Sequence, residues 1–311
     1  MSIQLRLLES KEWFEKAMYY SFRKFNTWCL QWRYSNLGEP FINEDWDILV
    51  LLDGCRPEYL FECDLPDGDQ STRYSTGGES WEFMQANFVG RELHDTVYVT
   101  ANPHAYKIPD GTFHFTRNLL ETDWDVDLGT VPPASVTEAA IDAVVEFPQK
   151  RLIVHYMQPH YPFIGEIGKS IDESAITPGE PGENAYGGPD LWKRLQSRGQ
   201  EVNKHDVLDA YRENHEIVAA EFPRLLTELS GKVVITADHA NLIGDRAWPI
   251  PVRIYGHPSN TPHPNLRRVP WLEITNGPRP SIKVDEPIAN NQERDIDDDT
   301  VKKQLQALGY V

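Results

Sequence analysis

The stretch Trp46-Asp-Ile-Leu-Val-Leu-Leu-Asp53 holds five consecutive apolar residues between two aspartates. An unbroken apolar run of this length is typical of a strand that is buried on both faces of a parallel sheet. Such a strand would present the carboxylate of Asp53 at its carboxyl end, which is where open α/β sheets bind ligands. Gly54 and Pro57 follow at once and are expected to turn the chain.

The same pattern recurs in a second stretch, Lys232-Val-Val-Ile-Thr-Ala-Asp238-His239. Its apolar run also ends in a carboxylate, and here an imidazole lies beside it. We therefore expect two buried strands that present their polar groups at one edge of one sheet.

The remaining pattern alternates strands with helices. This alternation predicts the α/β class, with a mainly parallel central sheet and helices on both faces. Further strands are expected at 96–101, 113–117, 151–156 and 269–274. Helices are expected at 80–88 with Ser80 as N-cap, at 132–147 capped by Ser135 or Thr137, and at 205–229 with a break near Pro223.

Three segments follow from this pattern. Residues 1–45 read as an N-terminal helical segment, and residues 46–274 as the catalytic domain. Within that domain, 164–203 is rich in Gly, Pro, Glu and Ser and is interpreted as an insertion or lid. Residues 275–311 are expected to form an acidic tail that closes with a short helix at 300–310.

The composition of the 311 residues limits the partners. The formal net charge is −18, so nucleic acid is not an expected partner, because a polyphosphate needs a basic face. The excess of acid also suggests adaptation to high salt. The first 45 residues mix aromatic with basic side chains, which leaves peripheral membrane contact open, although we favour a helix packed on the body.

The three cysteines, Cys29, Cys55 and Cys63, have no spacing typical of a disulfide framework or a zinc site. They fit a reducing interior. No stretch has the length of a transmembrane segment, and the first ten residues lack the apolar core of a signal peptide. We therefore expect a cytoplasmic protein.

Polar residues that can bind metals or anions follow the predicted strands. The set is Asp53, Asn102, His104, His155, His160, Asp238 and His239. Each alone has a structural explanation, but their recurrence at one edge of a sheet indicates a functional site. Carboxylate and imidazole groups together suit a divalent cation such as zinc or manganese.

A metal site of this kind would activate a hydroxyl nucleophile. The candidates are Ser75, Thr76 and Ser80, which lie just before or at the start of the predicted helix at 80–88. The amide groups at a helix N-terminus could hold a phosphate or sulfate. The structural explanation of Ser80 is that it only caps the helix.

The motifs of this chain resemble those of the alkaline phosphatase superfamily, and within it the branch of sulfatase-like and lipoteichoic-acid-synthase-like proteins. The resemblance covers residues 46–274 and extends to sulfatase-like proteins of halophilic archaea. The motifs are D-I-L-V-L-L-D-G-C-R-P-E (47–58), Y-S-T-G-G-E-S-W-E-F (74–83), H-Y-M-Q-P-H-Y-P-F (155–163), V-V-I-T-A-D-H (233–239), and Y-G-H-P with R-R-V-P-W-L-E-I (within 255–274).

The resemblance implies an alkaline-phosphatase-like fold and a role for each matching residue. Asp53, Asp238 and His239 would bind a divalent metal (Mn, Zn, Mg or Ca), and His257 would bind a second metal or the substrate. One ion is expected, and a second is left open. Ser80 aligns with the nucleophile, Thr76 is a second candidate, and His160 would contact the anionic group or protonate the leaving group. The expected substrate contacts are His155, Asn102, His104 and Arg56.

The resemblance also implies a metal-dependent hydrolase or transferase of phosphate or sulfate esters, with an anionic, lipid-linked or glycan substrate. Two features depart from the family pattern. The C-x-P-S-R signature is absent, which argues against a formylglycine sulfatase, and Asp238-His239-Ala240-Asn241 stands where D-H-G-E is usual. Two alternatives stay open: a binding or scaffold protein that has lost the chemistry, and a two-metal isomerase similar to phosphoglycerate mutase.

Overall fold

The computed structural model describes residues 3–174, 191–196 and 203–288. Its centre is a seven-stranded sheet with the order β2-β9-β6-β1-β5-β3-β4. A separate hairpin consists of β7 and β8. The strands are β1 (Ile48–Asp53), β2 (Asp69–Tyr74), β3 (Leu93–Thr100), β4 (Phe113–Asn118), β5 (Arg151–Pro159), β6 (Gly231–Ala237), β7 (Leu242–Arg246), β8 (Arg253–Gly256) and β9 (Arg268–Asn276).

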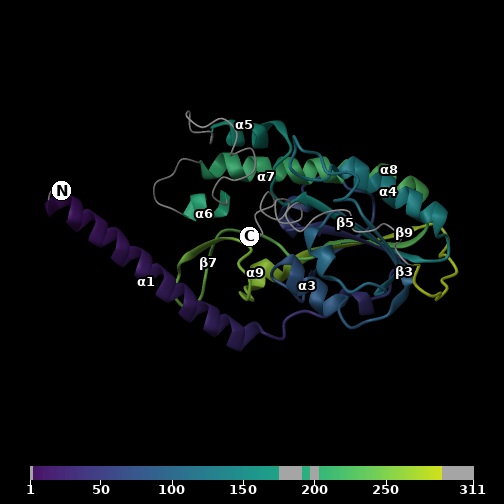
Figure 1. Cartoon of the computed structure of the whole chain (residues 1–311), viewed down its shortest axis with the longest axis horizontal. Coiled ribbons are helices and arrows are strands. Elements are labelled where there is room, and N and C mark those ends of the chain that lie inside the picture. Colours follow the sequence, from purple (N-terminus) through teal and green to yellow (C-terminus); the bar gives the residue numbers. More distant parts are fainter. Residues whose placement is uncertain (1–2, 175–190, 197–202, 289–311) are drawn as a thin grey trace.

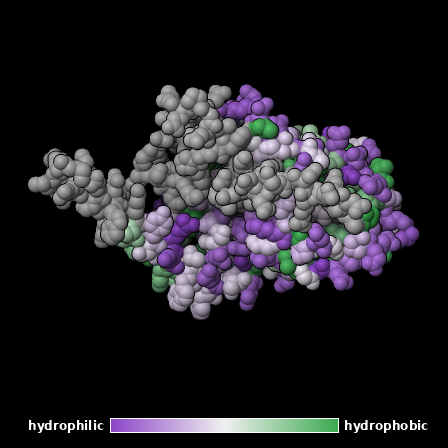
Figure 2. Space-filling model, viewed as in Figure 1, coloured by the Kyte–Doolittle hydropathy of each residue, from purple (hydrophilic) through white to green (hydrophobic). Residues whose placement is uncertain are grey.

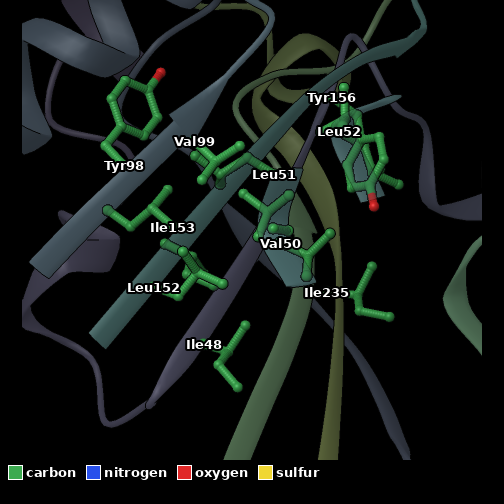
Figure 3. Close-up of a cluster of buried hydrophobic side chains, with 14 of the residues drawn as sticks. Ile48, Val50, Leu51, Leu52, Tyr98, Val99, Leu152, Ile153, Tyr156 and Ile235 are labelled. Carbon is green, nitrogen blue, oxygen red and sulfur yellow. The ribbon is translucent and has the colours of Figure 1, made fainter. Parts of the chain in front are cut away.

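The sheet is mainly parallel, as the sequence predicts. Strands β6, β1, β5, β3 and β4 run in one direction, whereas β9 is antiparallel to both of its neighbours, β6 and β2. Val50 at the middle of β1 pairs with Val154 on one side and with Ile235 on the other. Residues 48–52 are at most 4% exposed, so β1 is covered on both faces by the packed side chains seen in Figure 3.

Helices cover both faces of this sheet. Figure 1 shows α4, α7 and α8 on one side and α3 on the other. The helices are α1 (Ile3–Tyr34), α2 (Pro57–Leu60), α3 (Ser80–Asn87), α4 (Pro133–Glu146), α5 (Glu166–Ser174), α6 (Leu191–Gln196), α7 (Lys204–Ala219), α8 (Phe222–Glu228) and α9 (Pro264–Arg267), with short 3-10 turns η1 (Phe41–Asn43) and η2 (Pro103–Lys107). The break expected near Pro223 is confirmed, because α8 begins at Phe222.

Both predictions of helix caps were wrong. Glu79, and not Ser80, is the N-cap of α3, and its carboxylate accepts hydrogen bonds from the amides of Trp81 and Glu82. Pro132 is the N-cap of α4, where proline fixes the entry of the chain without a side-chain hydrogen bond. The strand β2 and the hairpin β7–β8 fall in stretches where the sequence pattern predicts no strand. Neither β2 nor β8 has the buried apolar run that marks a central strand.

The described part of the 164–203 segment contains α5 and α6, while residues 175–190 and 197–202 lie outside the described residues. Beyond β9 the chain crosses from the start of β1 to β4. There Arg279 binds the carboxylates of Asp45 and Asp47, and the amide of Ile288 donates to the carbonyl of His114. The closing helix predicted at 300–310 lies outside the described residues.

Helix α1 runs along one end of the molecule beside the β7–β8 hairpin, where the hydroxyl of Tyr19 donates to the carbonyl of Arg253, and its start extends past the rest of the chain (Figure 1). Asn26 of α1 exchanges two hydrogen bonds with the backbone of Ile250. Among the described residues, none of the helices combines the length and apolar character that crossing a membrane requires. The face seen in Figure 2 is mostly hydrophilic outside the grey atoms, in keeping with the acidic composition.

Candidate metal and nucleophile site

The register of the sheet brings the two predicted strand ends together. Leu52 of β1 pairs with Ala237 of the neighbouring parallel strand β6. The next residues along the two strands are Asp53 and Asp238, so their carboxylates lie side by side at the carboxyl edge. His239 follows Asp238 directly.

Asp53, Asp238 and His239 form a compact buried cluster. Each can direct one ligand atom so that all three atoms lie within 4.8 Å of one another, and each residue is fully buried. His239 Nε2 is 3.4 Å from Asp53 Oδ1 and 3.7 Å from Asp238 Oδ2. Within residues 3–174, 191–196 and 203–288 this is the one group of three such side chains that could hold a metal ion.

The hydrogen bonds around this cluster orient it for a cation. Oδ1 of Asp238 accepts from the amides of Gly54 and His239, while its buried Oδ2 has no hydrogen-bond partner among the described residues. The carbonyl of Ala240 lies 2.9 Å from Nδ1 of His239 and accepts a hydrogen bond from it. This bond turns Nε2 toward the carboxylates, where it can serve as the ligand atom. The donor set of two carboxylates and one imidazole fits a divalent cation.

The charges of the cluster also indicate a cation site. Burial disfavours the imidazolium of His239, but the carboxylates of Asp238 and Asp53 outweigh this and raise the pKa of His239 to about 10. Burial likewise disfavours a charged Asp53, yet the imidazoles of His160 and His239 hold its pKa below the ordinary range. The two buried carboxylates thus require a positive charge between them, which a bound cation would supply in place of the proton.

Of the three hydroxyl candidates, Ser80 is the one that reaches this cluster. It is the first residue of α3, and its Oγ lies 3.1 Å from Asp53 Oδ2 and 3.3 Å from His239 Nε2. The hydroxyl of Ser75 instead donates to the backbone carbonyl of Asp238, and the hydroxyl of Thr76 accepts from the side chain of Asn87. Both are therefore engaged in holding the loop before α3.

The start of α3 is not an open anion cradle. The carboxylate of Glu79 lies 3.0 Å from the amide of Trp81 and 3.1 Å from that of Glu82. Burial raises the pKa of Glu79, and Nε2 of His104 lies 3.8 Å from its Oε2. Sequence reasoning missed Glu79, although a glutamate directly before the nucleophile candidate was a visible signal.

The other strand-end residues support the carboxylates. Asn102 donates from Nδ2 to Asp53 Oδ2 at 2.7 Å, and its Oδ1 accepts the amide of His104. His155 hydrogen-bonds through Nδ1 to the hydroxyl of Tyr98, which leaves Nε2 3.6 Å from Asp238 Oδ2. Burial lowers the pKa of His104 to about 3, so this imidazole is neutral near neutral pH.

His160 and His257 form a second imidazole pair beside the cluster. Their Nε2 atoms lie 2.8 Å apart, and the ring of His257 is also 5.0 Å from that of His239 between centroids. At 2.8 Å one of the two nitrogens carries the shared proton. Burial and the neighbouring imidazoles hold the pKa of His257 well below the ordinary value.

A buried asparagine that the sequence gave no reason to select fixes the backbone of the His160 loop. Nδ2 of Asn214, on α7, lies 3.4, 3.2 and 3.1 Å from the carbonyl oxygens of Pro159, His160 and Pro162. Its Oδ1 accepts from the amide of Ile164 at 2.9 Å. The long helix therefore sets the position of His160.

Arg56 is held in ion pairs. Its guanidinium donates to Glu58, to Asp245 at 2.9 Å and to the carbonyl of Asn241 at 3.2 Å. These carboxylates balance its charge, so the predicted substrate contact at Arg56 has no support in this geometry. The prediction stays untested.

No protein-family model and no curated protein matches the chain. Similar solved structures include the zinc complex of the C-terminal periplasmic domain of EcEptC from Escherichia coli (12% identity, TM-score 0.46, 77% of this chain and 76% of that chain). Two others are the lipoteichoic acid synthase LtaP from Listeria monocytogenes (11%, 0.43, 80% and 71%) and a protein in the alkaline phosphatase superfamily from Vibrio parahaemolyticus (12%, 0.43, 92% and 75%). The last of these structures is named as a member of the superfamily that the sequence motifs resemble. At these TM-scores the likeness gives no residue correspondences.

Proposed function

We propose that this protein is a metal-dependent hydrolase or transferase of phosphate or sulfate esters, with Ser80 as its nucleophile, in the alkaline phosphatase superfamily. One observation carries the proposal. The Ser80 hydroxyl lies within 3.3 Å of both Asp53 and His239, inside the buried carboxylate–imidazole cluster. A hydroxyl placed against metal-ligand groups is the arrangement that metal-activated nucleophiles require.

Asp53, Asp238 and His239 would hold one divalent cation. The imidazole in this set favours zinc over magnesium or calcium, and the two carboxylates also suit manganese. When bound, the cation lowers the pKa of the neighbouring hydroxyl and offsets the charge of an anionic ester. His257 completes no second set of three ligands among the described residues, and its pairing with His160 favours a role on the substrate instead.

The proposed reaction has two displacements. Oγ of Ser80 forms a bond to the phosphorus or sulfur atom while the bond to the leaving-group oxygen breaks. Asp53 Oδ2 accepts the hydrogen bond of Ser80 and orients the hydroxyl, whose proton passes to water as Oγ attacks. The His160–His257 pair, in the form that carries one extra proton, gives that proton to the leaving oxygen and is left neutral. Water or an acceptor alcohol then attacks the phosphorus or sulfur atom and gives a proton to this pair. The bond to Oγ of Ser80 breaks, and Oγ takes a proton from water.

The finer features remain proposals. The choice between a lipid-linked and a glycan ester, the choice between hydrolysis and transfer, the cytoplasmic location and the adaptation to high salt are predictions of the sequence alone. Two of the similar solved structures are named as a phosphonate monoester hydrolase and a lipoteichoic acid synthase. These names describe those proteins and do not identify the substrate of this chain.

The test is metal content together with turnover of p-nitrophenyl phosphate, a phosphodiester and a sulfate ester, with Zn²⁺, Mn²⁺ or Mg²⁺ added. Asp238→Asn should lose metal and turnover together. Ser80→Ala should keep the metal and lose turnover. Thr76→Val removes a nearby hydroxyl outside the cluster and is the matched control. A phosphoryl or sulfuryl adduct on Ser80 by mass spectrometry would identify the nucleophile directly.

A binding or scaffold protein that has lost the chemistry is the second candidate. Two observations favour it. Asn241 stands where the superfamily pattern has a glutamate, and the Glu79 carboxylate already occupies the amides at the start of α3. Absence of bound metal in the wild-type protein under every supplementation would support this candidate and overturn the enzyme.

A further inference from the structure

One face of α1 exposes large apolar side chains at regular helical spacing. Met18, Phe25, Trp28 and Trp32 are 41%, 46%, 63% and 80% exposed, and Ser21 on the same stripe is also exposed. The spacing of these five positions alternates between three and four residues, so they form one continuous stripe along the helix.

The opposite face of the same helix packs on the body of the protein. Asn26 and Leu30 are buried on this face. Asn26 is fixed by its two hydrogen bonds to Ile250 in the β7–β8 connection. The orientation of the helix is therefore set by one face, and this presents the aromatic stripe outward.

The charge of this segment differs in sign from that of the whole chain. Residues 17–34 contain Arg23, Lys24 and Arg33 and neither Asp nor Glu, whereas the formal net charge of the chain is −18. Arg23, Lys24 and Trp28 also line a hollow of about 360 Å³ between α1 and the loop at Ser259 and Thr261. Basic and aromatic side chains thus meet on one surface.

We propose that this face of α1, residues 18–32, binds the surface of an anionic lipid membrane. Tryptophan and phenylalanine on one face, with arginine and lysine beside them, are the composition of helices that lie in the membrane interface. The indole ring prefers the headgroup level because one end is apolar and the other polar. Lysine and arginine bury their alkyl stems and keep the charge at the headgroups.

A second copy of the chain is the competing occupant, since an alternating spacing of three and four is also that of a coiled-coil seam. The charges favour the membrane. Two copies of this helix would bring Arg23, Lys24 and Arg33 near their own equivalents, and these like charges repel. An anionic bilayer complements the helix instead. The inference does not depend on the proposed ester chemistry.

The experiment is flotation of the full chain with vesicles of phosphatidylcholine alone or mixed with phosphatidylglycerol. We expect binding to the anionic vesicles, weaker at about 0.5 M than at about 0.1 M NaCl. Trp28→Ser/Trp32→Ser should weaken binding at least about tenfold, because the apolar anchors are gone. Arg23→Gln/Lys24→Gln should weaken binding to anionic vesicles by about 30-fold.

The matched controls are Val145→Ser on α4 and Arg212→Gln on α7. Both side chains are exposed and distant in sequence from α1, and both variants should bind vesicles like the wild type. Turnover of a soluble ester should be unchanged in every variant, which separates this inference from the proposed function. Failure of the wild type to bind any vesicle, or equal binding by all variants, would overturn the inference. So would a stable dimer that Trp28→Ser/Trp32→Ser dissociates without any vesicle binding.

Discussion

Asn214→Ala should lower the free energy of unfolding by about 2 to 3 kcal/mol. The side chain is fully buried, its Oδ1 accepts one amide, and its Nδ2 faces three carbonyl oxygens of the loop around His160. An amide nitrogen has two hydrogens, so three hydrogen bonds are lost in all, at about 1 kcal/mol each. The higher helix propensity of alanine offsets this loss by roughly 0.7 kcal/mol.

Urea unfolding at constant m-value measures this loss. Arg212→Ala changes an exposed residue on the same helix and should stay within about 0.5 kcal/mol of the wild type. Asn214→Asp keeps the shape but replaces the donors with a carboxylate facing carbonyl oxygens. It should be less stable than the wild type near neutral pH and should recover part of the loss in acid, where the protonated carboxyl can donate. A loss below about 0.5 kcal/mol in Asn214→Ala would refute the reasoning.

Three further predictions concern the cluster. Ser80→Ala should lower turnover of the preferred ester by at least about 10³-fold with metal content unchanged, and a turnover close to wild type would exclude Ser80 as nucleophile. In the metal-free protein the pKa of His239 is raised to about 10 from 6.5, so the stability it contributes is fully present below 6.5 and is lost as the pH rises through about 10. Melting temperatures of the chelated protein should therefore fall over that range, and added Zn²⁺ should flatten the curve. Gly54→Ala should destabilise by about 1 to 3 kcal/mol in urea, because φ is +64° and the added Cβ would lie 2.8 Å from the Asn241 side chain; an unchanged midpoint would contradict this.

The residues that sequence reasoning found are those whose position depends on one strand. Asp53 and Asp238 each follow an apolar run, and neighbouring parallel strands end at one edge, so their proximity follows from local pattern and sheet topology together. The edge strand β2 could not be predicted in this way. All six of its residues are exposed, and it is a strand because of its pairing with β9.

The roles of single polar groups depend on partners that are distant in sequence. Glu79 could not be told from any other acidic residue until its carboxylate was seen on the amides of α3. Arg56 could serve a substrate by its sequence position, but Asp245, 189 residues away, holds it in an ion pair. Asn214 lies on a helix whose periodicity marks it only as an inward position.

Local sequence patterns suffice to predict the strands that form the centre of the sheet, the carboxylates at their ends and the helical character of residues 3–34. These depend on the solvation of consecutive side chains, which is a local property. The folded arrangement of the elements, and no local pattern, brings Ser80 rather than Ser75 or Thr76 to the side chains of Asp53 and His239. It also decided which face of α1 stays exposed. Both depend on the packing of one element against another, and the energy of such contacts is not encoded in any single stretch of the chain.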